Sequence, residues 1–132
     1  MSALPAKRRT QTGELVNSKH QLEFEKQFTR LVLARFDQAE ALIPNHKFLS
    51  IRRMIRKYGA VVVARRMVDP ANLLHLNLGL KVLAKNNLTR CSIEQAVIDV
   101  GFGKETPFSR LDVKNAEARL WSVIHDQSEI GV

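Results

Sequence analysis

The sequence is poor in cysteine and in aromatic residues, and this limits both its covalent chemistry and its core. The single cysteine, Cys91, excludes an intrachain disulfide and is consistent with a reducing compartment. It has no Cys or His at metal-ligand spacing, so we expect it to be a small buried or half-buried apolar side chain. Aromatic residues make up only 6 % of the 132 residues, which predicts a core of mainly Leu, Ile, Val and Ala.

Long hydrophobic runs are also missing. No segment reaches the roughly 18 consecutive apolar residues of a bilayer-spanning helix, so we expect no membrane association. The basic residues near the N-terminus are followed by polar residues at 11–14 rather than by an apolar stretch, and they do not form a secretory signal. The sequence therefore predicts a cytoplasmic protein.

Residues with catalytic or metal-binding chemistry are scattered. None of the four histidines has a Cys, Asp or His at the spacing of a zinc site. The segment from Gly101 to Lys104 lacks the glycine spacing and the preceding strand of a phosphate-binding loop. We therefore predict a protein that is not an enzyme, with no catalytic residues, no metal ligands and no cofactor.

Positive charge is concentrated in the middle of the chain. The formal net charge is +8, and residues 41–93 hold 10 bases and one acid, Asp69, whereas residues 94–132 hold 4 bases and 7 acids. Such a basic region favours a polyanionic partner. A single carboxylate there also argues against a nuclease that binds metal ions through paired acids.

The spacing of apolar residues predicts an all-α fold, a compact bundle of about five helices. Residues 1–16 show no periodicity and are expected to form a flexible, disordered basic tail. We expect residues 17–126 to form a single helical domain and residues 127–132 to be a frayed C-terminus. No period-2 run or hairpin turn signal indicates a strand pair.

Proline, glycine and capping residues mark the expected ends of the first helices. Helical spacing extends from about residue 17 to Leu42, and Pro44 interrupts it. Asn45 is placed to cap the next helix, which Gly59 is expected to end. Residues 60–68 are rich in β-branched side chains, but a helix is favoured over a strand because helices are expected on both sides.

Similar signals divide the second half of the chain. Residues 73–86 form a strongly apolar helix that we expect to be central. Ser92 and Gln95 have the spacing of a capping box at the start of the next helix. Asp112 is placed to cap the last helix, and we expect Trp121 to pack in the core rather than at a dimer contact.

The segment at residues 46–58, HKFLSIRRMIRKY, has the densest basic pattern. Arg52 lies one helical turn from Arg56, and Arg53 lies one turn from Lys57, so their cations can follow successive phosphates. The opposite side of this helix is expected to be an apolar stripe of Phe48, Ile51, Ile55 and Tyr58. The predicted nucleic-acid-binding residues are Arg52, Arg53, Arg56, Lys57, Arg65 and Arg66, assisted by Lys7, Arg8 and Arg9.

These observations predict a nucleic-acid-binding accessory or regulatory protein, with DNA favoured over RNA as its partner. Phosphate contacts of this kind give affinity with little sequence preference. A second class stays open, an inhibitor or adaptor that docks the same basic surface on an acidic protein. A solvated helix face with no partner is a third explanation. The sequence leaves the oligomeric state open, including a homodimer.

Two resemblances bear on this hypothesis. With Ser92, Gly101, Phe102 and Phe108 at matching intervals, residues 92–110 resemble the second helix-turn-helix of the arabinose-activator class of bacterial regulators, which places a helix in the major groove. Here, however, Pro107 would lie inside the recognition helix, where proline is costly. We therefore carry no DNA-binding role over to this segment.

A broader set of positions consists mostly of packing and capping residues. It comprises Tyr58-Gly59, Ala64-Arg65-Arg66, Gly79-Leu80, Leu83, Leu88-Thr89, Ser92-Ile93-Glu94, Val97, Phe108, Ala116, Arg119 and Leu120. Over about residues 48–120 the chain thereby resembles a small helical domain of uncharacterised bacterial and phage proteins. The resemblance implies a helical fold and carries no activity with it.

Overall fold

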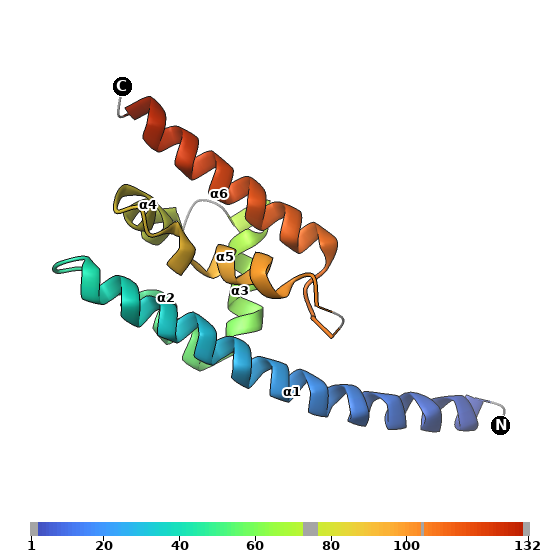
Figure 1. Ribbon diagram of the computed structural model, residues 1–132. Helices are drawn as coiled ribbons and strands as arrows, with labels where there is room; N and C mark the ends of the chain where they lie inside the picture. The colour runs from blue at the N-terminus through green and yellow to red at the C-terminus, as the bar shows by residue number, and fades with distance from the viewer. Residues whose placement is uncertain (1–2, 73–76, 104, 131–132) are drawn as a thin grey trace.

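A long helix, α1, runs along one side of the molecule, and five shorter α-helices pack beside it in the computed structural model (Figure 1). The structure describes the backbone of residues 3–72, 77–103 and 105–130, and the side chains of residues 19–71, 79–103 and 105–125. In chain order the elements are α1 (Ala3–Leu42), α2 (Leu49–Tyr58), α3 (Ala60–Val68), the 3-10 turn η1 (Pro70–Asn72), α4 (Asn77–Lys85), the 3-10 turn η2 (Thr89–Cys91), α5 (Ile93–Val100) and α6 (Arg110–Ile130).

The predicted all-α fold class is confirmed. Over the described backbone there are six α-helices, where the sequence indicated about five, and no strand. Residues 60–68 form a helix despite their β-branched side chains. The side chains of the expected tail at residues 1–16 and of the expected frayed end at 127–132 lie outside the described residues, while the described backbone of 3–16 and 127–130 belongs to α1 and α6. Residues 73–76 of the expected apolar helix lie outside the described residues.

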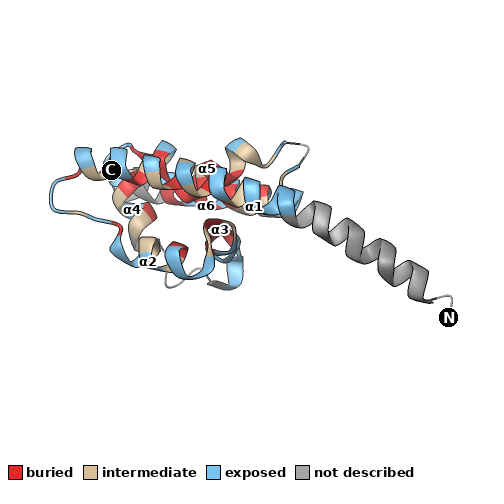
Figure 2. Ribbon diagram, turned by 90° about the horizontal axis from the view of Figure 1, so that it is seen from below, coloured by how far each residue is buried: buried red, intermediate tan, exposed pale blue. Residues whose placement is uncertain are grey.

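The short helices α3 and α5 occupy the space between α1 and α6, and each contacts both of them (Figure 1). Buried positions gather where these four helices meet (Figure 2). Cys91 is 1 % exposed and lies in this core, as expected. Full burial of a Val, Leu, Ile or Phe side chain contributes about 1.5 to 3 kcal/mol, so burial of this apolar surface is the main force holding the helices together.

The few aromatic residues tie distant parts of the chain together. Phe28 on α1 packs edge-to-face on Phe108, with ring centroids 5.1 Å apart, which holds the segment before α6 against α1. Phe36 on α1 stacks on Phe48, with centroids 5.0 Å apart, and holds the start of α2 in the same way. These two contacts hold the segments that lead into α2 and α6 against α1.

Gly59 forms the corner between α2 and α3, as its position in the sequence predicts. Its φ of +90° lies in a region that residues with a Cβ rarely adopt, and its N–H donates to the Ile55 carbonyl at 2.8 Å. Glu25 of α1 approaches closely and accepts from the Val61 N–H, the second residue of α3, at 3.3 Å. The corner is thus held by a carboxylate from another helix.

The start of α2 differs from the prediction. Asn45 does not cap this helix; it adopts a positive φ of 63° in the preceding turn, a conformation that asparagine tolerates. The N-cap position is Phe48, which has no capping side chain of its own. Its N–H donates instead to Glu40 Oε2 on α1, at 2.8 Å. The partner for the first turn therefore comes from a neighbouring helix.

The starts of the last two helices, α5 and α6, are stabilised by capping residues close in the sequence. Ser92 Oγ accepts from the Gln95 N–H at 3.0 Å, as predicted, although the Gln95 side chain donates to Asp99 at 2.9 Å rather than back to Ser92. Asp112 was expected to be the cap of α6 and is not. Ser109 accepts from the Asp112 N–H at 3.0 Å, and the Asp112 carboxylate accepts from the Ser109 N–H at 2.9 Å. This reciprocal pair is a capping box.

Trp121 is a second correction, because it is 63 % exposed and does not pack in the core. It stacks on His125 one turn further along α6, with ring centroids 3.6 Å apart. Leu120 and Val123 on the same helix are buried. The reason is geometric: each helical residue is rotated about 100° from the one before it, so Leu120 and Trp121 cannot both face inward.

Candidate nucleic-acid interface

Helix α2 divides its residues between the core and the solvent. Ile55 is buried, and Ile51 and Met54 are half-buried against the core. Arg53, Arg56 and Lys57 are exposed on the other side. Because residues three and four apart share one face of a helix, the amphipathic spacing that buries Ile51 and Ile55 also gathers these three cations.

Tyr58 lies with the cations and not on the apolar stripe that the sequence predicted. It is the last residue of α2 and is 43 % exposed. The Lys57 ammonium lies 5.2 Å from the centroid of its ring, and the Arg66 guanidinium carbon of α3 lies 4.9 Å from it. Both distances are within the range of cation–π attraction, about 6 Å. The apolar stripe thus ends one turn earlier than expected.

We call Arg53, Arg56, Lys57, Tyr58 and Arg66 the Tyr58 cluster. Its four cations are exposed, and none forms an ion pair with any residue whose side chain is described. Arg66 joins the cluster only because α3 turns back beside α2 at Gly59. The cluster therefore combines one partly exposed aromatic ring with four cations of α2 and α3 that form no ion pair with a described side chain.

Arg52 was predicted to bind phosphate, but in the structure its side chain forms ion pairs with carboxylates of α1. It is 23 % exposed and pairs with Glu40 at 2.9 Å and with Asp37 at 2.7 Å, both on α1. Hydrogen bonding to Glu40, assisted by Asp37, raises the pKa of Arg52 above its ordinary value. Arg52 therefore joins α2 to α1 and is not part of the Tyr58 cluster.

Arg65 is likewise occupied by neighbours. Its side chain is 49 % exposed, lies 3.5 Å from the Asp112 carboxylate and donates to the Pro107 carbonyl. It joins α3 to the start of α6. Of the other predicted residues, Lys7, Arg8 and Arg9 lie outside the described side chains.

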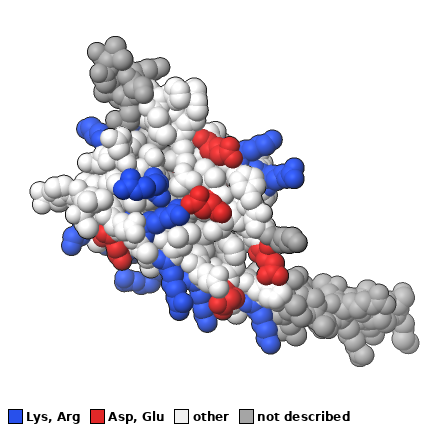
Figure 3. All heavy atoms as spheres, in the orientation of Figure 1, with Lys and Arg blue, Asp and Glu red and all other residues white. Residues whose placement is uncertain are grey.

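Basic side chains also occur elsewhere on the surface. On the face shown in Figure 3, Lys and Arg are interspersed with Asp and Glu. Lys81 and Lys85 of α4, for example, are exposed and form no ion pair with a described side chain. Charge alone therefore does not single out the Tyr58 cluster; the aromatic ring between its cations does.

Comparison with known proteins adds no relative: no protein-family model, no curated protein and no solved structure matches the chain. Among the described residues, no group of His, Cys, Asp and Glu side chains could hold a metal ion. No helix in that part of the chain is both long enough and apolar enough to cross a membrane.

Proposed function

We propose that this protein binds nucleic acid through the Tyr58 cluster. One observation supports the proposal most directly: an exposed tyrosine ring contacts two cations, Lys57 and Arg66, and two further exposed cations lie on the same helix as Tyr58. Cations arranged in this way neutralise phosphates, and each neutralised phosphate releases counterions. The contacts follow the backbone, so the expected binding has little sequence preference.

Electrostatic compensation favours this corner over the remaining predicted residues. Arg52 and Arg65 are engaged with carboxylates within the fold, and a phosphate would have to displace those partners. The four cations of the Tyr58 cluster have no such competitor among the described side chains. Tyr58 adds a ring on which an unpaired base can stack, and such stacking is sequence-tolerant.

The test is fluorescence anisotropy with labelled duplex DNA, single-stranded DNA and RNA of one sequence. If the four cations each meet a phosphate, log K should fall with log salt with a slope of about −3 to −4 between about 50 and 200 mM salt. The variant Arg53→Glu/Lys57→Glu is expected to lose binding to all three nucleic acids.

Lys81→Glu/Lys85→Glu is the matched control. It alters an exposed pair with the same spacing on α4, and it changes the net charge equally. We expect this variant to retain most of the binding. Equal losses in both variants would mean that total charge, rather than the Tyr58 cluster, controls binding. A folded wild-type protein that binds no nucleic acid at low salt would instead favour an acidic protein as the partner of this surface.

A further inference from the structure

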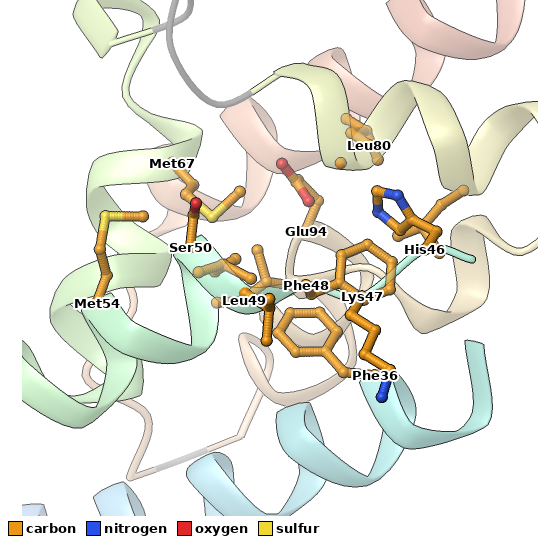
Figure 4. Close-up of a pocket in the computed structure, with 14 residues that line it drawn as sticks. Phe36, His46, Lys47, Phe48, Leu49, Ser50, Met54, Met67, Leu80 and Glu94 are labelled. Carbon is orange, nitrogen blue, oxygen red and sulfur yellow. The ribbon is translucent and has the colours of Figure 1, made fainter. Parts of the chain in front are cut away.

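A cavity with a volume of about 220 Å³ lies between the N-terminal part of α2 and helices α1, α3, α4 and α5 (Figure 4). Its wall is mainly aliphatic, aromatic and thioether surface, and its polar lining residues are Glu94, His46, Lys47 and Ser50. We call it the Glu94 cavity; the lining residues that matter here are Phe36, Phe48, Met54, Met67, Leu83 and Glu94.

Glu94 is the acidic group among the lining residues. It is 1 % exposed, so its carboxylate has left water for an apolar surrounding. Its one described ion pair is with Arg119 of α6, whose Nε donates to Oε2 at 2.9 Å. Figure 4 shows the Glu94 carboxylate among the side chains that line the cavity. Burying a carboxylate this deeply is costly unless hydrogen bonds compensate it.

The ion pair itself is incompletely satisfied. Arg119 Nη1 and Nη2 are buried and have no hydrogen-bond partner among the described residues. Arg119 therefore contacts Glu94 through a single nitrogen, although a guanidinium can hold a carboxylate at two points. The unpartnered atoms of this pair are thus donors on Arg119, which does not line the cavity. A molecule in the cavity meets the pair through Glu94, whose carboxylate accepts hydrogen bonds.

The volume of the cavity limits the size of a molecule that could donate a hydrogen bond to Glu94. An apolar cavity of about 150 Å³ stays dry and binds benzene. A volume of about 220 Å³ leaves room for a ring with a short substituent. The aromatic and thioether side chains that line the cavity, Phe36, Phe48, Met54 and Met67, match such a ring by dispersion and sulfur–aromatic contacts.

We infer that the Glu94 cavity binds a compact apolar molecule, about the size of a substituted benzene, that donates one hydrogen bond to the Glu94 carboxylate. The site is separate from the Tyr58 cluster, and the inference does not depend on nucleic-acid binding. Small molecules with an aromatic ring and one alcohol group are the chemical class that fits. An anionic ring compound is disfavoured because its charge would face the carboxylate.

The experiment titrates the isotope-labelled full chain with benzyl alcohol, toluene and benzoate while amide NMR signals are recorded. All three probes contain a benzene ring, but only benzyl alcohol carries a hydrogen-bond donor, toluene has no polar group and benzoate carries a negative charge. We expect benzyl alcohol to shift the Ser50 and Gly79 amides saturably, with a dissociation constant of about 1 mM or tighter. Toluene should bind about tenfold more weakly, as expected for one lost hydrogen bond to a charged acceptor. Benzoate should bind least.

Two variants test the location and the carboxylate separately. A Cβ at Gly79 would lie 3.7 Å from the Phe48 ring, an ordinary contact, so Gly79→Leu adds a side chain at the cavity wall without a backbone clash. This variant should keep a folded spectrum and lose benzyl alcohol binding. Glu94→Leu/Arg119→Met removes both charges together, a change that buried pairs often tolerate. It should bind toluene as tightly as benzyl alcohol.

Three results would overturn the inference. The first is the absence of saturable binding by benzyl alcohol. The second is equal affinity of the wild-type protein for benzyl alcohol and toluene, which would mean that no hydrogen bond to the Glu94 carboxylate contributes to binding. The third is unchanged binding in a folded Gly79→Leu variant, which would place the ligand outside the Glu94 cavity.

Discussion

Arg52 and Glu40 form a two-point ion pair that joins α2 to α1. Arg52 Nε donates to Glu40 Oε2 at 3.1 Å, and Arg52 Nη2 donates to Oε1 at 2.9 Å. The same Oε2 accepts the Phe48 N–H at the start of α2. One carboxylate on α1 thus positions both the first turn of α2 and the arginine that follows it, and this orientation directs Arg53, Arg56 and Lys57 to the solvent.

Arg52→Ala should destabilise the fold without removing a cation from the Tyr58 cluster. It leaves Glu40, whose side chain is 18 % exposed, without its charged partner. Loss of hydrogen bonds to a charged group of this kind costs about 2 kcal/mol. Urea unfolding followed by circular dichroism measures the change. Arg53→Ala is the control and should stay within about 0.5 kcal/mol of wild type, because Arg53 is exposed and forms no ion pair with a described side chain. Similar stability of the two variants would contradict the structural role of Arg52.

The Glu40 ion pair should make the fold sensitive to acid. Burial alone would raise the pKa of Glu40, but hydrogen bonds from Arg52 and the Phe48 N–H, together with the Arg52 charge, outweigh it and lower this pKa below the ordinary 4.5. The unfolded chain then binds more protons, so this contribution to stability is present above pH 4.5 and is lost as pH falls through the folded pKa. Unfolding free energies of wild type and Glu40→Gln should converge over that range; parallel curves would contradict the assignment.

Glu94 should have the opposite pH dependence. Burial raises its pKa above the ordinary value of 4.5, against the opposing effect of Arg119. The folded state then binds the proton more tightly than the unfolded chain, so the contribution is full below pH 4.5 and declines as pH rises through the folded pKa. The stability of wild type relative to Glu94→Leu/Arg119→Met should therefore fall with rising pH in this window. A relative stability that rises with pH would show that Arg119 dominates.

Tyr58→Ala should separate single-stranded from duplex binding. Stacking of a base on an aromatic ring is worth about 1 to 3 kcal/mol, and only unpaired bases offer a free face. We expect anisotropy titrations to show weaker binding of single-stranded DNA and RNA, with duplex binding nearly unchanged. Tyr58→Phe keeps the ring and should behave like wild type. An equal loss for all three substrates would mean that Tyr58 only holds Lys57 and Arg66 in place.

Gly59→Ala should weaken the corner that carries the cluster. The residue has a φ of +90°, and an added Cβ would lie 2.5 Å from Glu25 Oε1. Strain at such a position costs more than about 1 kcal/mol. Chemical unfolding is expected to show this loss, whereas Gly79→Ala, where the nearest contact is 3.7 Å, should be neutral or stabilising. A stable Gly59→Ala variant would imply that the α2–α3 corner tolerates a different geometry.

Local signals predicted the helices well where the chain satisfies its own backbone groups. Gly59 ends α2, and Ser92 caps α5, because both effects need only neighbouring residues. The cap of α6 was assigned to Asp112 when Ser109 holds it, although the spacing of the two residues is itself a capping-box signal. The cap of α2 had no local signal, since its carboxylate comes from α1.

The candidate site was predictable only in part. The spacing of basic residues on α2 indicated a cationic face, and Arg53, Arg56 and Lys57 do share one. No spacing rule separates them from Arg52, because its partners Asp37 and Glu40 belong to another helix. The contact between Tyr58 and Arg66 could not be predicted for the same reason, because Arg66 belongs to α3 and lies beside Tyr58 only through the turn at Gly59.

The sequence by itself determined the all-α class, the C-terminal ends of helices such as α1 and α2, and the excess of positive charge, because periodicity, helix-ending residues and composition are local or additive properties. Only the tertiary structure decided which cations are compensated, that Trp121 lies outside the core, and that Glu94 is buried beside a cavity. Each of these depends on which residues from distant parts of the chain meet when the helices pack, and pairing and burial are properties of that packing.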